Sequence, residues 1–184
     1  MKPWKRVAPT SVKMAGYRTI VEKSFIGPAG EEISFTTVSP EGSTDVGVVA
    51  LTKDNKVVIA RQYRPGPECI FDEMPGGGVD NDEDLTRAAF RELKEETGYT
   101  SEGSIEYLGV VCNDAYSNSR HHYFLLKDCY KITTIDNDEY EYTEPIEISI
   151  AQFIDNAKKY RMSDAAGVLL AYEALMELTD EKAN

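Results

Sequence analysis

The sequence has no long run of hydrophobic residues, which excludes a helix that crosses a membrane. Its longest apolar segments, residues 46–51 and 148–150, are far shorter than the roughly 20 residues that such a helix needs. The start of the chain, MKPWKR, leads into no apolar segment like the core of a signal peptide. We therefore expect a cytoplasmic protein without a membrane partner.

Cysteine is scarce as well. Cys69, Cys112 and Cys129 are widely spaced and form no CxxC pair, so the sequence predicts neither a disulfide framework nor a zinc site. We expect all three to be reduced packing residues.

Positive charge is in deficit, because 20 Lys and Arg residues face 32 Asp and Glu residues and the net charge is −12. A nucleic acid would be repelled unless a basic face offset this charge. Basic residues gather within residues 1–24, whereas residues 80–96 and 136–147 are densely acidic. This distribution fits a small anionic substrate held through a metal better than it fits a nucleic-acid partner.

The chain's 184 residues suit one domain, or one domain with a small appendage. A turn signal at residues 27–30 favours a small N-terminal antiparallel sheet, and a soft boundary follows near residues 42–45. We therefore expect an N-terminal β-sheet subdomain, residues 1–44, and a second domain, residues 45–184. Strands are expected at 17–25, 32–38, 46–52, 57–63, 70–74, 105–111 and 122–126, and helices at 81–97, 151–159 and 165–178. Without a regular βαβ alternation, this order indicates an α/β fold with a mixed sheet packed between helices.

Residues 81–97 form the clearest predicted helix. Asp80 and Glu83 have the spacing of a capping box, acidic residues crowd the expected first turn, and Gly98 supplies a stop signal. Its apolar stripe consists of Leu85, Ala89 and Leu93.

Glu92 and Glu96 are neighbours on this helix, about 40° apart around its axis. Their repulsion costs about 0.2–0.5 kcal/mol, and a carboxylate near a helix C-terminus costs about 0.3–1 kcal/mol more. Both continue the face of Leu85 and Ala89, so they are expected to point toward the protein body. A bound hard cation would remove both penalties.

Three consecutive glycines, residues 76–78, precede this helix. The simpler interpretation is that the glutamates are solvated and paired with Arg91 and Lys94. That interpretation does not account for the glycines, which let a backbone approach a ligand closely. The combination therefore favours a phosphate or metal site.

These residues resemble a known family. Gly77, Glu83 and the segment RELKEETGY at residues 91–99 match every fixed position of the Nudix box, G-x5-E-x7-R-E-U-x-E-E-x-G-U, where U is apolar or aromatic. Residues 61–65 and 73–77 are similar to the strand and loop before the box in ADP-ribose and nucleotide-sugar pyrophosphatases. The resemblance covers roughly residues 15–178. It implies a Nudix-type α/β/α sandwich around a mixed sheet.

The resemblance also implies a reaction: hydrolysis of the diphosphate bond of ADP-ribose or a nucleoside diphosphate sugar, giving a nucleoside monophosphate and a sugar phosphate. The implied cofactor is Mg²⁺, with Mn²⁺ possible. Glu92, Glu96 and the carbonyl of Gly76 would be the metal ligands. Glu95 would lie nearby in the catalytic group, and Arg91 would orient a glutamate.

The catalytic base is expected in a loop outside the box, as in similar enzymes. Glu141, in the acidic segment 138–144, is our candidate, and Glu139 and Glu144 compete with it.

The substrate-binding candidates are Arg64, Arg61, Glu73 and Trp4. Arg61 and Arg64 are three residues apart, so a regular strand sends them to opposite faces and only one should face the cleft. By resemblance Arg64 contacts phosphate or terminal ribose, and a surface ion pair is the alternative. Trp4 could stack a base across the interface of a homodimer, or simply anchor the N-terminal sheet.

Three alternatives remain open. Residues 112–119 contain no proline where enzymes of the ADP-ribose group often carry one, and Tyr116 is faintly similar to dinucleoside polyphosphate hydrolases. A calcium loop starting at Asp80 is disfavoured because Leu85 stands where glycine is needed. A Nudix-like ADP-ribose sensor without catalysis would not need the intact glutamate set.

His121 and His122 point to opposite faces of a strand and are expected to be structural.

Overall fold

The computed structural model describes residues 3–16, 18–112, 114–135 and 142–180. The chain divides into two compact units, Met1–Thr44 with Cys112–Arg120, and Asp45–Val111 with His121–Asn184. Within the described residues, no helix is long and apolar enough to span a bilayer.

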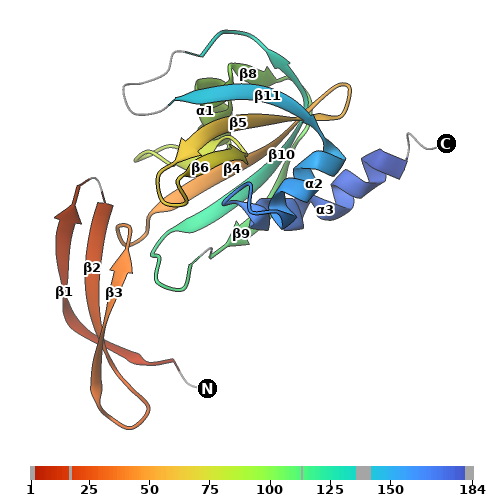
Figure 1. Cartoon of the computed structure of the whole chain (residues 1–184). Helices are drawn as coiled ribbons and strands as arrows, with labels where there is room; N and C mark the ends of the chain where they lie inside the picture. Colours follow the sequence, from red (N-terminus) through yellow and green to blue (C-terminus); the bar gives the residue numbers. More distant parts are fainter. Residues whose placement is uncertain (1–2, 17, 113, 136–141, 181–184) are drawn as a thin grey trace. The chain divides into compact units, whose positions relative to one another are not determined.

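The first unit is a three-stranded antiparallel sheet of β1 (Lys5–Ala15), β2 (Arg18–Ile26) and β3 (Glu32–Val38), in that order (Figure 1). The expected hairpin turn forms, with Gly27 N donating to Glu31 O at 2.8 Å and Gly30 at φ 89°. Strand β1 was not expected. Its pairing with β2 shifts register between Val7 and Ser11, and Pro9 lies in this interval. A proline supplies no N–H for a strand ladder, and this break hides the alternation that would predict a strand.

Residues 112–120, which the sequence division assigned to the second part, pack in the first unit. Val38 N donates to Tyr116 O at 2.8 Å, and Asn118 N donates to Val38 O at 2.9 Å. The Asn118 side chain donates to Thr37 Oγ1 at 3.1 Å and to Ser39 O at 2.7 Å. These bonds add the segment to the end of β3, and they join positions too distant in sequence for a local pattern to predict.

The second unit is built on an eight-stranded mixed sheet. Its main path runs β11 (Thr143–Ser149), β5 (Lys56–Arg64), β4 (Thr44–Thr52), β10 (Arg120–Lys131) and β8 (Tyr99–Ser101). Three further strands pair off this path: β6 (Cys69–Glu73) with β5, β7 (Gly76–Gly78) with β4, and β9 (Ile105–Val111) with β10. The sequence analysis did not predict the short strands β7 and β8. It also did not predict β11, whose first two residues belong to the acidic segment 138–144.

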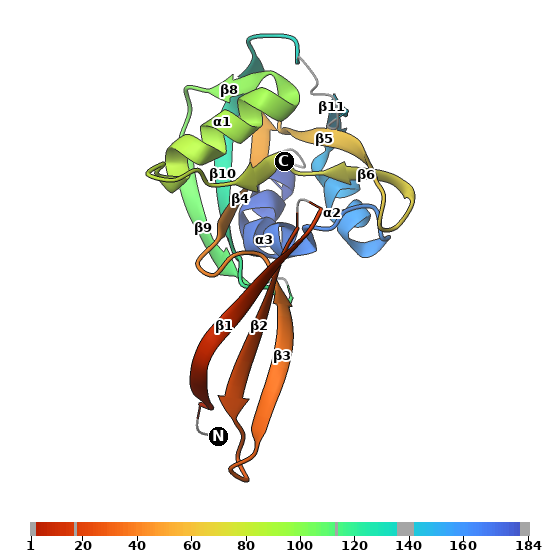
Figure 2. The same ribbon diagram turned by 90° about the vertical axis from the view of Figure 1, so that its left-hand side faces the viewer.

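Helices cover both faces of the large sheet. Helix α1 (Leu85–Thr97) lies on one face, and α2 (Ile150–Lys158) and α3 (Ala165–Asp180) lie on the other (Figures 1 and 2). Strand alternation divides the core accordingly: Val58 packs with Ala89 and Leu93 of α1, whereas its neighbour Ile59 packs with Phe153 of α2. The predicted α/β/α sandwich is confirmed.

Helix α1 begins four residues later than predicted. Its N-cap is Asp84, whose Oδ1 accepts from Arg87 N at 2.9 Å. The capping-box contact between Asp80 and Glu83 does form, with Asp80 N donating to Glu83 Oε2 at 3.3 Å, but it closes a turn before the helix. Asp82 at φ 65° breaks the helical path between the two candidate caps. Consequently no acidic residue lies in the first turn.

The predicted end of α1 is confirmed. Gly98 adopts φ 75°, and its N–H donates to Lys94 O at 2.8 Å. This left-handed cap turns the chain directly into β8.

Candidate active site

The glycine strand β7 lies against the sheet and against helix α1. Gly76 pairs with Gly47 and Gly77 with Val46 of β4. A Cβ at Gly76 would stand 2.3 Å from Val46 O, so only glycine allows this approach. A Cβ at Gly77 would stand 2.6 Å from Glu92 Oε1. The Glu92 carboxylate therefore occupies the space that a side chain at residue 77 would fill.

Glu92 and Glu96 converge on this glycine strand. Glu92 is buried, with 8% of its surface exposed, and Glu96 Oε2 accepts from Gly76 N at 2.9 Å. Thr143 Oγ1 donates to the main-chain oxygen of Glu96 at 3.0 Å, which ties the end of α1 to β11. The structure thus brings together Gly76, Glu92 and Glu96, the three residues that the sequence singled out as metal ligands.

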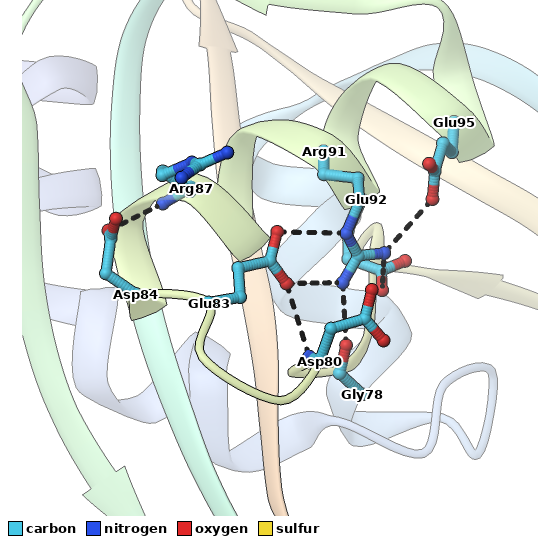
Figure 3. Close-up of polar contacts among 8 residues, drawn as sticks. All are labelled: Gly78, Asp80, Glu83, Asp84, Arg87, Arg91, Glu92 and Glu95. Carbon is cyan, nitrogen blue, oxygen red and sulfur yellow. Dashed lines mark hydrogen bonds and ion pairs between the residues drawn. The ribbon is translucent and has the colours of Figure 1, made fainter.

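Arg91 holds three carboxylates at once (Figure 3). Its Nε and Nη2 donate to Glu83 at 3.1 and 2.9 Å, and its Nη1 donates to Glu92 at 2.8 Å and Glu95 at 3.1 Å. Nη2 also donates to Gly78 O at 2.8 Å. These bonds, with Glu83 first, raise the pKa of Arg91, and the bond from Arg91 lowers the pKa of Glu83. A guanidinium engaged in this way can orient glutamates.

The donor chemistry fits a hard cation. Within the described ranges, no group of three or more His, Cys, Asp or Glu side chains is arranged so that it could hold a metal ion by itself. Glu92 and Glu96 nevertheless gather carboxylate oxygens beside the backbone of Gly76, and oxygen is the ligand atom that Mg²⁺ and Mn²⁺ prefer. The buried carboxylate of Glu92 accepts from Arg91, whose Nη1 also donates to Glu95.

Arg64 is held by a buried carboxylate. Its Nε donates to Glu73, which is fully buried and also accepts from the Ser163 hydroxyl and, at 2.9 Å, from Ser163 N. Burial, and then repulsion from Glu73, raise the pKa of the adjacent Asp164 to about 6. Arg64 thus forms an ion pair, but with a buried carboxylate and not with a surface one as the alternative had it. The Arg64 side chain remains 42% exposed, so a contact with phosphate or ribose stays a prediction.

Ser163 and Asp164 were missed by the sequence analysis. They lie just before α3, where a Ser-Asp pair looks like an ordinary helix cap. The hydrogen bonds of Ser163 to Glu73 span 90 positions of the chain, and no local pattern signals them.

Arg61 lies on the other face of β5, as strand geometry predicts. Its Nε and Nη2 donate to Asp72 Oδ1 and Oδ2 at 2.6 and 3.1 Å, and these bonds raise the pKa of Arg61. Asp72 is 4% exposed and also accepts from Asn156 Nδ2 of α2 at 3.3 Å. Arg61 therefore lies on the face covered by α2, and Arg64, three residues further along β5, points to the opposite side of the strand.

Comparison with known protein families decides the assignment. Residues 43–166, about two thirds of the chain, match the family model described as the NUDIX domain. The chain belongs to the Nudix hydrolase family.

Relatives of this Nudix hydrolase carry several names. The methanol dehydrogenase activator of Bacillus methanolicus is 30% identical over 139 residues, which cover 74% of this chain and 75% of that protein. The ADP-ribose pyrophosphatase of Saccharomyces cerevisiae is 36% identical over 98 residues, 48% of this chain and 41% of the yeast protein. The RNA pyrophosphohydrolase of Pelagibacter ubique is 37% identical over 95 residues, 45% of this chain and 59% of that protein. The chain thus spans less than two thirds of the length of the last two relatives.

A solved structure described as an ADP compounds hydrolase has the same fold. It aligns with a TM-score of 0.76 and 20% sequence identity, covering 95% of this chain and 96% of that chain.

The remaining candidate residues of the Nudix hydrolase lie apart from the glycine strand or outside the described residues. Glu141 and Glu139 fall in the segment that the structure does not describe. Glu144 lies on β11, paired with Arg61 of β5. His121 and His122 have different partners, Asp45 at 3.4 Å and the Tyr107 hydroxyl at 2.9 Å, which supports a structural role.

Trp4 belongs to the first unit and packs in an aromatic cluster on its sheet. Its ring lies 6.1 Å from that of Phe35, which in turn lies 6.2 Å from Phe25 and 6.4 Å from Tyr116. Trp4 thus anchors this sheet, while 37% of its surface stays exposed.

Proposed function

We propose that this Nudix hydrolase is a metal-dependent enzyme that cuts the diphosphate bond of ADP-ribose or a related nucleoside diphosphate sugar. The products would be a nucleoside monophosphate, AMP in the case of ADP-ribose, and a sugar phosphate. The observation that carries the proposal is the convergence of Glu92 and Glu96 on the backbone of Gly76 and Gly77. The family membership and the relative named ADP-ribose pyrophosphatase support the substrate class.

Each site residue has a separate task in this proposal. Glu92 and Glu96, with the carbonyl of Gly76, would hold Mg²⁺, or Mn²⁺ as second choice. Such an ion, when bound, neutralises charge on the diphosphate and helps a water molecule to lose a proton. Arg91 fixes the direction of Glu92 and of Glu95, whose side chain is 58% exposed and so can meet solvent or substrate.

Arg64 is the proposed contact to phosphate or terminal ribose. Glu73 is the group that positions it, because its buried carboxylate binds Arg64 and Ser163 together. Glu141 is the proposed base that accepts the proton of the attacking water. Trp4 remains the candidate for stacking a nucleobase.

A homodimer formed through the three-stranded sheet is part of the proposal. Val12 and Met14 of β1 are 62% and 65% exposed, and a sheet of three strands buries few apolar side chains alone. The molar mass in solution tests this, and a monomer at working concentrations would exclude it.

Hydrolysis of 5′-triphosphorylated RNA or of dinucleoside polyphosphates is the second candidate. The relative named RNA pyrophosphohydrolase favours it, and these reactions also break a bond between two phosphates. The net charge of −12 disfavours a long RNA substrate.

A substrate panel tests the proposal. ADP-ribose, ADP-glucose, diadenosine tetraphosphate and a 5′-triphosphorylated RNA oligomer are assayed with Mg²⁺, with Mn²⁺ and with EDTA, and products are identified by mass spectrometry. We expect AMP and ribose 5-phosphate from ADP-ribose, and no product in EDTA. Faster turnover of the RNA or of diadenosine tetraphosphate would favour the second candidate, and tight ADP-ribose binding without AMP release would identify a sensor.

A further inference from the structure

A pocket opens in the Nudix unit, and the glutamates of α1 do not line it. Its volume of about 560 Å³ lies within the range of about 300–1,000 Å³ that is usual for small-ligand sites. Residues of β5, β6 and β11 and of the connection from α2 to α3 line it. Gly76, Glu92 and Glu96 are not among the lining residues.

The register of three adjacent strands arranges the pocket residues in two rows. Arg61 of β5 is paired with Glu144 of β11 on one side and with Asp72 of β6 on the other, which makes a charged row. Two residues further along β5, Tyr63 is paired with Ile70 of β6. Paired residues on one face of a sheet lie about 4.5–5.5 Å apart at Cβ, so each row is continuous.

An aromatic row runs beside the charged one. Thr143 of β11 is paired with Gln62, and Tyr142, the residue before β11, lines the pocket together with Tyr63. Tyr142, Tyr63 and Ile70 are 72%, 55% and 56% exposed, and all three line the pocket. This row offers flat apolar surface on which an aromatic ring can stack.

The sheet separates this pocket from the catalytic glutamates. Ile59 packs with α2, and Arg61 and Tyr63 follow it at two-residue steps on the same face of β5. The bond from Asn156 of α2 to Asp72 places the charged row on that face too. Helix α1, with Glu92, covers the opposite face.

Hydrogen bonds hold the guanidinium of Arg61 and the backbone of Arg161 in place. Asp72 occupies the Nε and Nη2 edge of the Arg61 guanidinium, which leaves the Nη1 edge to face elsewhere. The backbone of Arg161 is held at both ends, since its N–H donates to Asn156 O at 3.2 Å and its oxygen accepts from Asp72 N at 2.8 Å. Asp72 forms an ion pair with Arg61, whereas no carboxylate of the described residues lies within ion-pair distance of Arg161, so the Arg161 guanidinium can meet an anion.

We propose that this pocket binds a nucleoside monophosphate. The base stacks on Tyr63 and Tyr142, the carboxylate of Glu144 accepts from ribose hydroxyls, and the phosphate binds Arg161 and the Nη1 edge of Arg61. Arg61, Arg161, Asp72 and Glu144 together bring no net charge to the pocket, so the added charge of a polyphosphate would meet repulsion from both carboxylates, whereas a monophosphate can be held by Arg161 and the Nη1 edge of Arg61.

AMP, the product of the proposed reaction, is the chosen ligand. This choice rests on the proposed function, whereas the site itself rests on the strand register and the pocket.

The test is calorimetric titration of AMP into the full chain in EDTA, where metal-dependent binding at the glutamates cannot contribute. We expect AMP to bind, and to bind more tightly than either adenosine or inorganic phosphate alone. Arg161→Ala should weaken AMP binding about tenfold or more, since it removes a charge-assisted bond. Lys158→Ala, which removes an exposed cation from the end of α2 outside the pocket, should leave AMP binding unchanged.

A second variant covers the case in which Arg161→Ala is unstable. Tyr63 is a half-exposed strand residue, and Tyr63→Leu should weaken binding of AMP and adenosine but not that of phosphate. Absence of AMP binding in EDTA, or equal binding by the wild type and both pocket variants, overturns the proposal. Glu96→Gln separates the two sites: AMP binding that persists in this variant, without ADP-ribose hydrolysis in the wild type, supports the pocket and contradicts the proposed function.

Discussion

Glu96→Gln is expected to lower turnover of ADP-ribose about a hundredfold while the protein keeps its fold. Glutamine retains a side-chain oxygen that can accept from Gly76 N, so the link between α1 and the glycine strand survives. The charge that would bind a cation is lost. Steady-state kcat measured over a Mg²⁺ titration, together with the thermal unfolding midpoint, checks both parts.

Glu106→Gln is the matched control, because Glu106 is an exposed glutamate on β9 with the same change of charge. Its activity and stability should equal those of the wild type. Near-normal kcat for Glu96→Gln at every Mg²⁺ concentration would contradict the assignment of Glu96 as a metal ligand.

Glu141→Gln should lower kcat more than KM, because a base acts on the bound substrate and contributes little to binding. Glu139→Gln is measured beside it as the competing candidate, whereas Glu144 pairs with Arg61 on the face of the sheet opposite to Glu92. An unchanged kcat for Glu141→Gln, with a loss in Glu139→Gln, would move the role of base to Glu139.

A helix or strand could be predicted where the pattern of apolar and polar residues within the segment matches the burial of its side chains. The alternation along β3 and the apolar stripe of α1 both led to the right element, as did Gly98 at the end of α1. Strands β1 and β7 could not be predicted in this way. Strand β1 contains Pro9 and exposes its apolar residues Val12 and Met14, and β7 consists of three glycines, which lack side chains to alternate.

In the candidate site too, features that depend on local spacing could be predicted, and contacts between distant segments could not. Helical spacing predicted that Glu92 and Glu96 would share an inward face, and the structure shows Glu92 buried and Glu96 bonded to Gly76. The start of α1 was predicted wrongly because Asp80 and Asp84 are both good caps, and the left-handed residue Asp82 between them decides in favour of Asp84. Ser163 could not be predicted as a partner of Glu73, since tertiary folding alone brings them together.

The three consecutive glycines are expected to respond differently to the same added methyl group. At Gly77, alanine places Cβ where the Glu92 carboxylate lies, 2.6 Å from Oε1. The end of a flexible side chain can move, so Gly77→Ala should stay folded with Glu92 displaced. A displacement on the order of an ångström can cost about a hundredfold in kcat.

At Gly76 the added Cβ would meet the main-chain oxygen of Val46 at 2.3 Å, which cannot move without disturbing the pairing of β7 with β4. Gly76→Ala should therefore destabilise the fold by about 1–3 kcal/mol, in the range of an overpacked core. At Gly78 the methyl meets no atom within 4 Å, and the carbonyl that Arg91 binds is kept, so Gly78→Ala is the control. Thermal unfolding and kcat for the three variants separate the effects. Gly77 matters in this proposal because it leaves room for the Glu92 carboxylate. Full activity of Gly77→Ala would therefore show that this carboxylate does not have to lie against the glycine strand for catalysis.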